Sequence, residues 1–199
     1  PRFTDLIAWA YLIDGARFAS PTHAVMCSEP ALQLMTWVEH NRDPALKLRF
    51  IQDLRRRTLD EIAAESYVQS GIAPLIRQRD EVLALLRERA VLVDGVVTYQ
   101  VLDKSHLQVS KFAPYYLYPD AHYVVGLSAL PGRTKISVGS NPWRSERRTA
   151  NIATLCGRYG GGGHPAVGAV SLKTDEVAAA QQYASEIAAV LKEAARQEG

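Results

Sequence analysis

Residues 158–170 have the sequence RYGGGGHPAVGAV, in which four consecutive glycines, Gly160 to Gly163, are followed directly by His164. Before them, Ile152 and Leu155 are spaced for one face of a helix, which predicts a helix over residues 147–158. After them, the small and β-branched residues 166–172 predict a strand. The glycine run therefore connects two regular elements, and both of its ends are fixed.

The glycine run allows two interpretations. Consecutive glycines can direct backbone N–H groups into one concavity and let a ligand approach without meeting a Cβ atom, which is how a chain binds phosphate oxygens. In this interpretation His164 stands at the rim of the loop. In the second, Gly157 and Gly160 end the helix and the remaining glycines fill a tight corner. We favour the phosphate-binding interpretation, because two glycines suffice to end a helix.

The segment upstream supplies polar groups and cations. Residues 135–144 predict a strand that ends in a turn carrying Ser140, Asn141 and Arg144. Arginines on both sides of the glycine run suit phosphate, because the guanidinium group is planar and donates several hydrogen bonds. These arginines are Arg144, Arg147, Arg148 and Arg158.

The segments KISVGSNPW (residues 135–143) and YGGGGHPAVGAV (residues 159–170) resemble the DHH-associated C-terminal domain of the DHH phosphoesterases. That family includes RecJ-like exonucleases, nanoRNases, cyclic-dinucleotide phosphodiesterases and exopolyphosphatases, and the likeness is greatest to members described as exopolyphosphatase-related. The resemblance implies that the substrate contacts the residues Gly161, Gly162, Gly163 and His164, with Ser140, Asn141 and Arg144 as further candidates.

A second resemblance lies near the start of the chain. Family members place their last metal-binding aspartate where a strand meets a short loop, and Asp14 follows an apolar run and precedes Phe18 by four residues. The resemblance makes Asp14 a candidate metal ligand, although Asp14-Gly15 is also a common turn dipeptide. The Asp-His-His and Asp-x-Asp motifs of the family are absent from the sequence. We therefore expect the chain to be the C-terminal part of a longer phosphoesterase rather than a complete relative that has lost catalysis.

Composition restricts the alternatives. The 199 residues are 47% hydrophobic and 22% charged, and the apolar runs are shorter than the roughly 20 residues that span a bilayer. Two cysteines, Cys27 and Cys156, favour reduced thiols and a cytoplasmic location. A net charge of +2 argues against a protein that coats nucleic acid by bulk electrostatics.

The pattern of the chain changes near Arg89. Helices are predicted over residues 29–42, 44–56, 59–67 and 75–89, followed by a hairpin around Asp94-Gly95, strands at 123–129 and 135–138, and a final amphipathic helix after Thr174. We predict an α/β fold in which residues 1–89 are a mostly helical part of the DHH catalytic domain and its linker helix. Residues 90–199 are predicted to form the DHH-associated substrate-binding domain, with a mixed sheet.

The resemblance implies a phosphoesterase that uses manganese or magnesium in a two-metal mechanism. Its substrate would be a phosphorylated small molecule, a short oligonucleotide or polyphosphate, and the resemblance is compatible with a homodimer. One alternative is a non-catalytic module that binds a nucleotide or a nucleic-acid end. Another is an RNA-contacting appendage, because a similar glycine-histidine loop occurs in alanyl-tRNA synthetases. Tyr115, Tyr116, Tyr118 and Trp143 are candidates either for the core or for stacking on a nucleobase.

Overall fold

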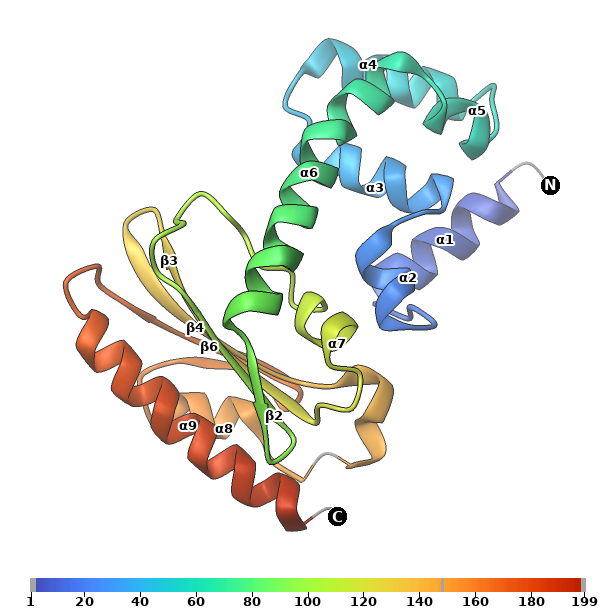
Figure 1. The fold of residues 1–199 in the computed structure, drawn as a ribbon. Coiled ribbons are helices and arrows are strands. Elements are labelled where there is room, and N and C mark those ends of the chain that lie inside the picture. The colour runs from blue at the N-terminus through green and yellow to red at the C-terminus, as the bar shows by residue number, and fades with distance from the viewer. Residues whose placement is uncertain (1–2, 148, 198–199) are drawn as a thin grey trace. The chain divides into compact units, whose positions relative to one another are not determined.

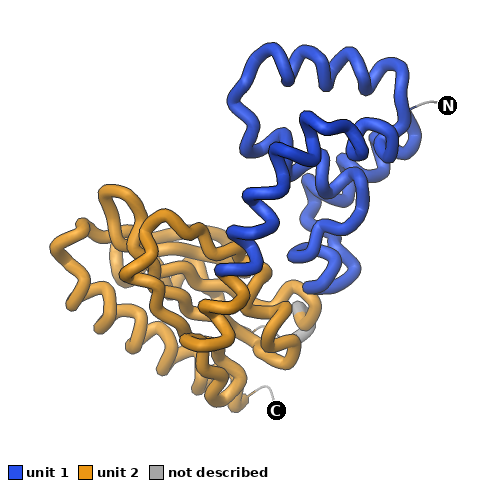
Figure 2. Tube along the Cα trace, turned by 45° about the horizontal axis from the view of Figure 1, so that its top comes forward, with its two compact units in different colours: residues 1–81 blue, residues 82–199 orange. Residues whose placement is uncertain are grey.

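The computed structural model describes residues 3–147 and 149–197. The chain divides into two compact units, residues 1–81 and residues 82–199 (Figure 2). The boundary lies inside a long helix, between Glu81 and Val82. The sequence predicted domains over residues 1–89 and 90–199, with the boundary at the end of that helix. These domain limits stay a prediction.

The first unit is helical. Its elements are α1 (Thr4–Asp14), α2 (Pro21–Met26), α3 (Pro30–His40), α4 (Pro44–Leu54), α5 (Leu59–Ala63) and the first part of α6 (Ser66–Arg89). Side chains at the helix starts accept backbone N–H groups: Asp43 caps α4, and Thr58 forms a capping box with Glu61 at α5. Trp37 and Ile62 lie in the core of this unit and are almost completely buried.

Helix α6 begins earlier than the sequence predicted. The sequence predicted one helix over residues 59–67 and another over residues 75–89. Pro74, which cannot donate a backbone hydrogen bond, lies between these two ranges. The structure instead continues the helix through Pro74. Val68 and Ile72, one turn apart before the proline, are 0% and 2% exposed in the core of the first unit. Their burial explains why the helix forms on the N-terminal side of Pro74.

The described residues of the second unit form a six-stranded mixed sheet in the order β1-β2-β3-β4-β6-β5 (Figure 1). The strands are β1 (Val91–Val93), β2 (Val96–Val101), β3 (Tyr123–Leu130), β4 (Arg133–Ser140), β5 (Gly162–His164) and β6 (Val167–Leu172). β2 and β3 are parallel, and the other neighbours are antiparallel. The predicted α/β class with a mixed sheet is confirmed.

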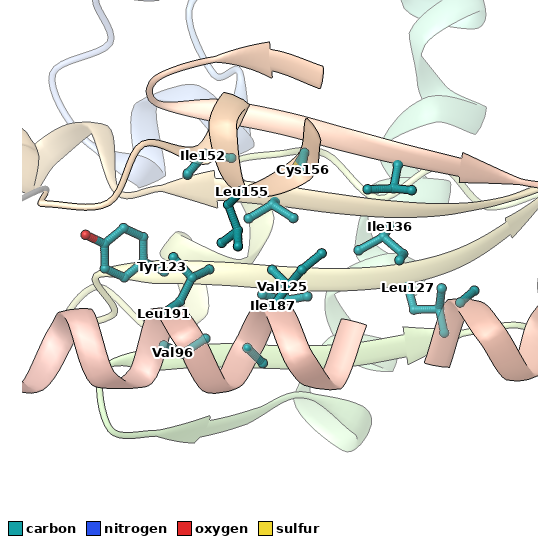
Figure 3. Close-up of a cluster of buried hydrophobic side chains, with 14 of the residues drawn as sticks. Val96, Tyr123, Val125, Leu127, Ile136, Ile152, Leu155, Cys156, Ile187 and Leu191 are labelled. Carbon is teal, nitrogen blue, oxygen red and sulfur yellow. The ribbon is translucent and has the colours of Figure 1, made fainter. Parts of the chain in front are cut away.

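Helices α8 (Ile152–Gly157) and α9 (Val177–Gln197) cover one face of this sheet, and α7 (Ala113–Leu117) lies on the other (Figure 1). Figure 3 shows the core under α8 and α9, where Tyr123, Val125 and Leu127 of β3 alternate with residues facing away. On the opposite face the ring of Tyr99 lies so close to Gly126 that a Cβ atom there would be 2.0 Å from it. The final helix, which the sequence predicted to be amphipathic, packs its apolar side chains on the sheet.

Candidate functional site at one end of the sheet

The predicted helix over residues 147–158 is shorter in the structure. A 3-10 helix η1 covers Pro142–Arg147, and α8 begins only at Ile152, where Asn151 caps it by accepting the N–H of Thr154 (3.1 Å). Arg148 lies outside the described residues. The hydroxyl of Tyr123 accepts the N–H groups of Thr149 (3.2 Å) and Ala150 (3.3 Å). This anchor satisfies two amides of the segment before α8, and no sequence signal predicted it.

The first glycines end α8. The Gly161 N–H donates to the Cys156 carbonyl (3.0 Å) and the Gly160 N–H to the Gly157 carbonyl (3.2 Å), while Gly160 has a φ of +74°. This pair of bonds with a left-handed residue is the Schellman arrangement of a helix C-terminus. The second interpretation of the sequence is therefore correct for Gly160, and Gly157 does not take a positive φ. The N–H of Gly161 is committed to the helix end.

The remaining glycines form an edge strand and not a loop. Residues Gly162–His164 form β5, which pairs antiparallel with β6 and ends the strand order of the sheet. A Cβ atom on Gly161 would lie 2.2 Å from the Ala169 carbonyl oxygen, and one on Gly163 would lie 2.2 Å from that of Val167. The expected loop is thus wrong for these residues, because close backbone approach allows them to pair.

An edge strand still presents backbone donors to a ligand. Successive residues of an antiparallel strand direct their N–H groups alternately toward the partner strand and away from it. β5 therefore directs part of its N–H groups away from β6. Gly162 has no heavy atom within 4 Å of its would-be Cβ atom, and His164 is exposed at the end of the strand. The phosphate-binding interpretation is consequently confined to the outer edge of β5 with His164 beside it.

Ser140 joins this hairpin to the end of β4. Its N–H and its hydroxyl both donate to the carbonyl oxygen of Ala166, at 2.9 and 3.1 Å. Ala166 lies in the turn two residues after His164. The structure thus brings together the glycine-histidine segment and the turn after β4, two regions that the sequence predicted to form one site.

Asn141 holds the turn in place. It is 2% exposed, and its Nδ2 donates to the carbonyls of Pro119 (3.1 Å) and Ala121 (2.8 Å). Its Oδ1 accepts the N–H of Trp143 (3.0 Å), and its own N–H donates to the His122 carbonyl (2.8 Å). Both donors of the side-chain amide are committed inside the protein. Asn141 therefore acts here as a positioning residue for the turn.

The cations around the hairpin differ in their surroundings. Arg144 forms an ion pair with Asp120, whose side chain is 79% exposed, and the side chain of Arg144 is 28% exposed. Asp120 was not among the predicted residues, and it neutralises part of the charge that Arg144 offers. Arg158 is exposed at the C-terminal end of α8. The side chain of Arg147 lies outside the described part of the structure.

Cys156, under the hairpin, has no chemical role in this geometry. It is fully buried in the core between α8 and the sheet (Figure 3), and burial raises the pKa of its thiol. A Cβ atom on Gly168 of β6 would be 2.8 Å from its sulfur. Cys156 therefore packs against the strand that supports β5, as a small apolar side chain does.

Asp14 lies in the first unit. It is the last residue of α1 and is exposed, so the strand that the resemblance implied before it is replaced by a helix. Among the described residues, no group of three or more His, Cys, Asp or Glu side chains could hold a metal ion. These residues do not by themselves fit a two-metal centre. Asp14 stays a predicted single ligand.

A groove elsewhere in the second unit carries none of the predicted site residues. It has a volume of about 640 Å³ and lies between α9 and the β1–β2 hairpin, with Thr98, Gln100 and Gln181 among its lining. Gln181 donates to Gln100 across it (3.0 Å). The candidate site at the hairpin lies at the opposite edge of the sheet.

No protein-family model matches the chain, and no curated protein is similar to it in sequence. Among solved structures, it resembles a pGpG-specific phosphodiesterase from Vibrio cholerae with a TM-score of 0.78 and 16% identity, over 99% of this chain and 67% of that one. An exopolyphosphatase-related protein from Bacteroides fragilis matches with a TM-score of 0.38 and 12% identity, over 77% of this chain and 46% of that one. A DHH domain from a member of the S1P family of ribosomal proteins matches with a TM-score of 0.38 and 17% identity, over 68% and 36%.

The neighbour with the TM-score of 0.78 is a phosphodiesterase, and the fold that the DHH resemblance implied is confirmed. The Vibrio protein carries this conclusion, because its match extends over nearly all of the present chain.

In the described ranges, no helix is both long and apolar enough to cross a membrane.

Proposed function

We propose that this chain contributes the substrate-binding part of a phosphoesterase that hydrolyses phosphodiester, phosphomonoester or phosphoanhydride bonds. The observation that supports it most is the meeting of the β5–β6 hairpin with the turn after β4 through the two hydrogen bonds of Ser140. The likeness in fold to a pGpG-specific phosphodiesterase is the second support. A linear dinucleotide such as pGpG is accordingly the first ligand to test.

In this proposal the terminal phosphate lies along the outer edge of β5. Outward N–H groups of residues 162–164 donate to its oxygens, and the imidazole of His164 donates a hydrogen bond to the same anion, which is charge-assisted because phosphate is charged. Gly162 leaves room for the phosphate, because nothing lies within 4 Å of its missing Cβ atom. Arg158 and Arg144 supply positive charge nearby. Arg144 would leave its ion pair with Asp120 and pair with the ligand phosphate instead.

The hydrolytic step is assigned to metal ions that the resemblance implies, manganese or magnesium, which activate water and stabilise in-line attack in such enzymes. We derive no step through them, because the described residues offer only the proposed ligand Asp14. A cytoplasmic location and a homodimer belong to the same proposal. Both cysteines are unpaired, which agrees with a reducing compartment.

A non-catalytic module that binds a nucleotide or a nucleic-acid end would use the same surface. The phosphoesterase is favoured over it by the fold similarity to the Vibrio phosphodiesterase. The third alternative, an RNA-contacting appendage, does not account for the helical first unit, which this similarity includes.

The test of the site is the variant His164→Ala, with calorimetric binding of pGpG and the melting temperature measured on the same protein. We expect pGpG affinity to fall about ten- to hundredfold, the equivalent of about 1.5–3 kcal/mol, because a charge-assisted hydrogen bond is lost. The melting temperature should stay unchanged, because His164 is exposed.

His106→Ala provides the matched control, since His106 is an exposed histidine of the same unit outside the hairpin. It should leave pGpG affinity unchanged. A lower melting temperature for His164→Ala with unaltered pGpG affinity would contradict the proposed site and leave His164 a structural role.

A further inference from the structure

A buried hydroxyl group in the second unit lacks a hydrogen-bond partner. Tyr115, in α7, is 2% exposed, and its ring packs edge-on against that of Trp143, so the ring belongs to the core. Among the described residues, none forms a hydrogen bond with the Oη atom of Tyr115. Burial raises the pKa of this hydroxyl, which therefore stays neutral and able to donate. Because an unsatisfied buried polar group costs free energy, a hydrogen bond from Tyr115 to a ligand would be favourable.

The missing side chain of Gly139 leaves a gap beside this hydroxyl. A Cβ atom on Gly139 would lie 3.1 Å from the Oη of Tyr115. Chain neighbours aside, no other heavy atom of the described structure would lie within 4 Å of that Cβ atom. Gly139 pairs with β3 and β6 and has no positive φ, so its backbone conformation does not require glycine. The glycine keeps space open next to the hydroxyl.

The gap lies on the same face of the sheet as His164. Val138 is buried in the core under α8 and α9, so the next residue, Gly139, faces away from these helices. Residues paired across neighbouring strands face the same side, and the register pairs Gly139 with Val167 and Val167 with His164. Two strand spacings, roughly 10 Å in all, therefore separate Gly139 from His164. Val167, between them, is 42% exposed, so this part of the face is open.

We infer that Tyr115 is a specificity-determining residue, whose hydroxyl donates a hydrogen bond at the Gly139 gap to the internal phosphodiester of a bound linear dinucleotide. This inference rests on the proposed function, because it starts from a terminal phosphate held at β5 and His164. A single phosphate group is too small to reach from there to the gap. A linear dinucleotide can extend its second phosphate group across Val167. Tyr115 would thus favour longer ligands over short ones.

Two ligands of different length provide the test: pGpG and inorganic phosphate. Binding of each to the full chain is followed through the amide resonances of residues 162–164, for the wild type and for Tyr115→Phe. The affinity for pGpG should fall about tenfold, because a hydrogen bond to a charged group is lost, while that for inorganic phosphate stays unchanged. The melting temperature should stay the same or rise slightly, because the variant breaks no hydrogen bond of the unliganded protein.

Tyr118→Phe is the matched control, three residues farther along the chain. The hydroxyl of Tyr118 donates to the carbonyl of Ala90 (2.9 Å), so its removal should lower the melting temperature and leave pGpG affinity unchanged. A second variant, Gly139→Ala, places a methyl group in the gap while Tyr115 is retained. It should weaken pGpG binding and leave the binding of inorganic phosphate as it is.

The outcomes separate this inference from the proposed function. Unchanged pGpG affinity in Tyr115→Phe or in Gly139→Ala, together with a loss in His164→Ala, would overturn the inference alone. Equal losses for pGpG and inorganic phosphate in Tyr115→Phe would overturn it as well and give Tyr115 a structural role. If the wild type binds neither ligand, the proposed site fails and the inference fails with it.

Discussion

The two edges of the sheet are both formed by hairpins, yet they are built from opposite kinds of residue. At one edge, β1 consists of Val91, Leu92 and Val93, whose side chains are 56%, 38% and 43% exposed. At the other edge, β5 consists of two glycines and His164. Bulky side chains flank the backbone at the first edge, whereas the second edge has almost no side chains beside its backbone groups.

The difference follows from what each hairpin must fit against. The β1–β2 turn, Asp94-Gly95, has φ values of +49° and +74°, the type I′ geometry that matches strand twist. The β5–β6 hairpin must also approach α8, whose Cys156 sulfur lies close to Gly168. Close approach excludes side chains at several positions of the second hairpin. Because β5 has so few side chains, a ligand can approach the backbone N–H groups at this edge.

Substituting a glycine that lacks room for a side chain should break the second hairpin. Gly163→Ala would set a Cβ atom 2.2 Å from the Val167 carbonyl oxygen, at a φ of +151° that only glycine adopts readily. We expect a loss of about 3 kcal/mol in the stability of the second unit, since backbone must move and the residue is strained. Amide hydrogen exchange of β6 measures this loss.

Gly162→Ala is the matched control one residue away. Nothing lies near its would-be Cβ atom and its φ is not positive, so alanine should leave β6 exchange unchanged or slow it slightly. If the two variants destabilise β6 equally, steric approach is not the reason for the glycines.

A smaller effect is expected at the helix end that leads into this hairpin. Gly160→Ala forces a residue with a Cβ atom into the left-handed conformation at a φ of +74°, but no atom lies within 4 Å of that Cβ. The cost should therefore be about 1 kcal/mol, from backbone strain alone. Gly160→Asn should recover part of it, because asparagine tolerates this conformation. Equal stability of the alanine variant and the wild type in urea unfolding would contradict the Schellman assignment.

The sequence predicted the first hairpin and missed the strand of the second. β-branched residues on both sides of Asp94-Gly95 carry their own local signal, and β1 and β2 form as expected. β5 has no such signal, because glycine has a low strand propensity and pairs here only through contacts with β6 and α8. The α8 start was misplaced for a related reason. The hydroxyl of Tyr123, which holds residues 149 and 150, lies 26 and 27 residues away from them in the sequence.

The candidate site was predictable in part. The meeting of Ser140 with the hairpin follows from the antiparallel pairing of β4 and β6. The sequence predicted both strands but not that they pair. The positioning role of Asn141 depends on the carbonyls of Pro119 and Ala121. The charge that Arg144 can offer depends on its ion pair with Asp120. These partners lie about 20 residues upstream in a segment without periodic pattern. Periodicity predicts which face of an element is buried, but it cannot show which polar partners an irregular segment supplies.

The smallest expected effect concerns the charges beside the first edge. Arg89, just before β1, forms an ion pair with Asp103, and its guanidinium holds the pKa of that carboxyl at about 2, below the usual 3.8. A lowered folded-state pKa means that the pair contributes stability above about pH 4 and loses it as the pH falls from 3.8 toward 2. Both side chains are partly exposed, so salt should screen the contribution strongly. In Arg89→Gln the pKa of the Asp103 carboxyl should rise from about 2 toward 3.8, although a backbone hydrogen bond and Lys104 still lower it. The midpoint of acid unfolding should be slightly higher in the variant, and 1 M salt should bring the wild type closer to the variant. Arg144→Gln, which removes an ion pair near the opposite edge, should leave that titration unmoved. If the pKa of Asp103 is the same in the wild type and in Arg89→Gln, the ion pair does not contribute to the stability of the first edge.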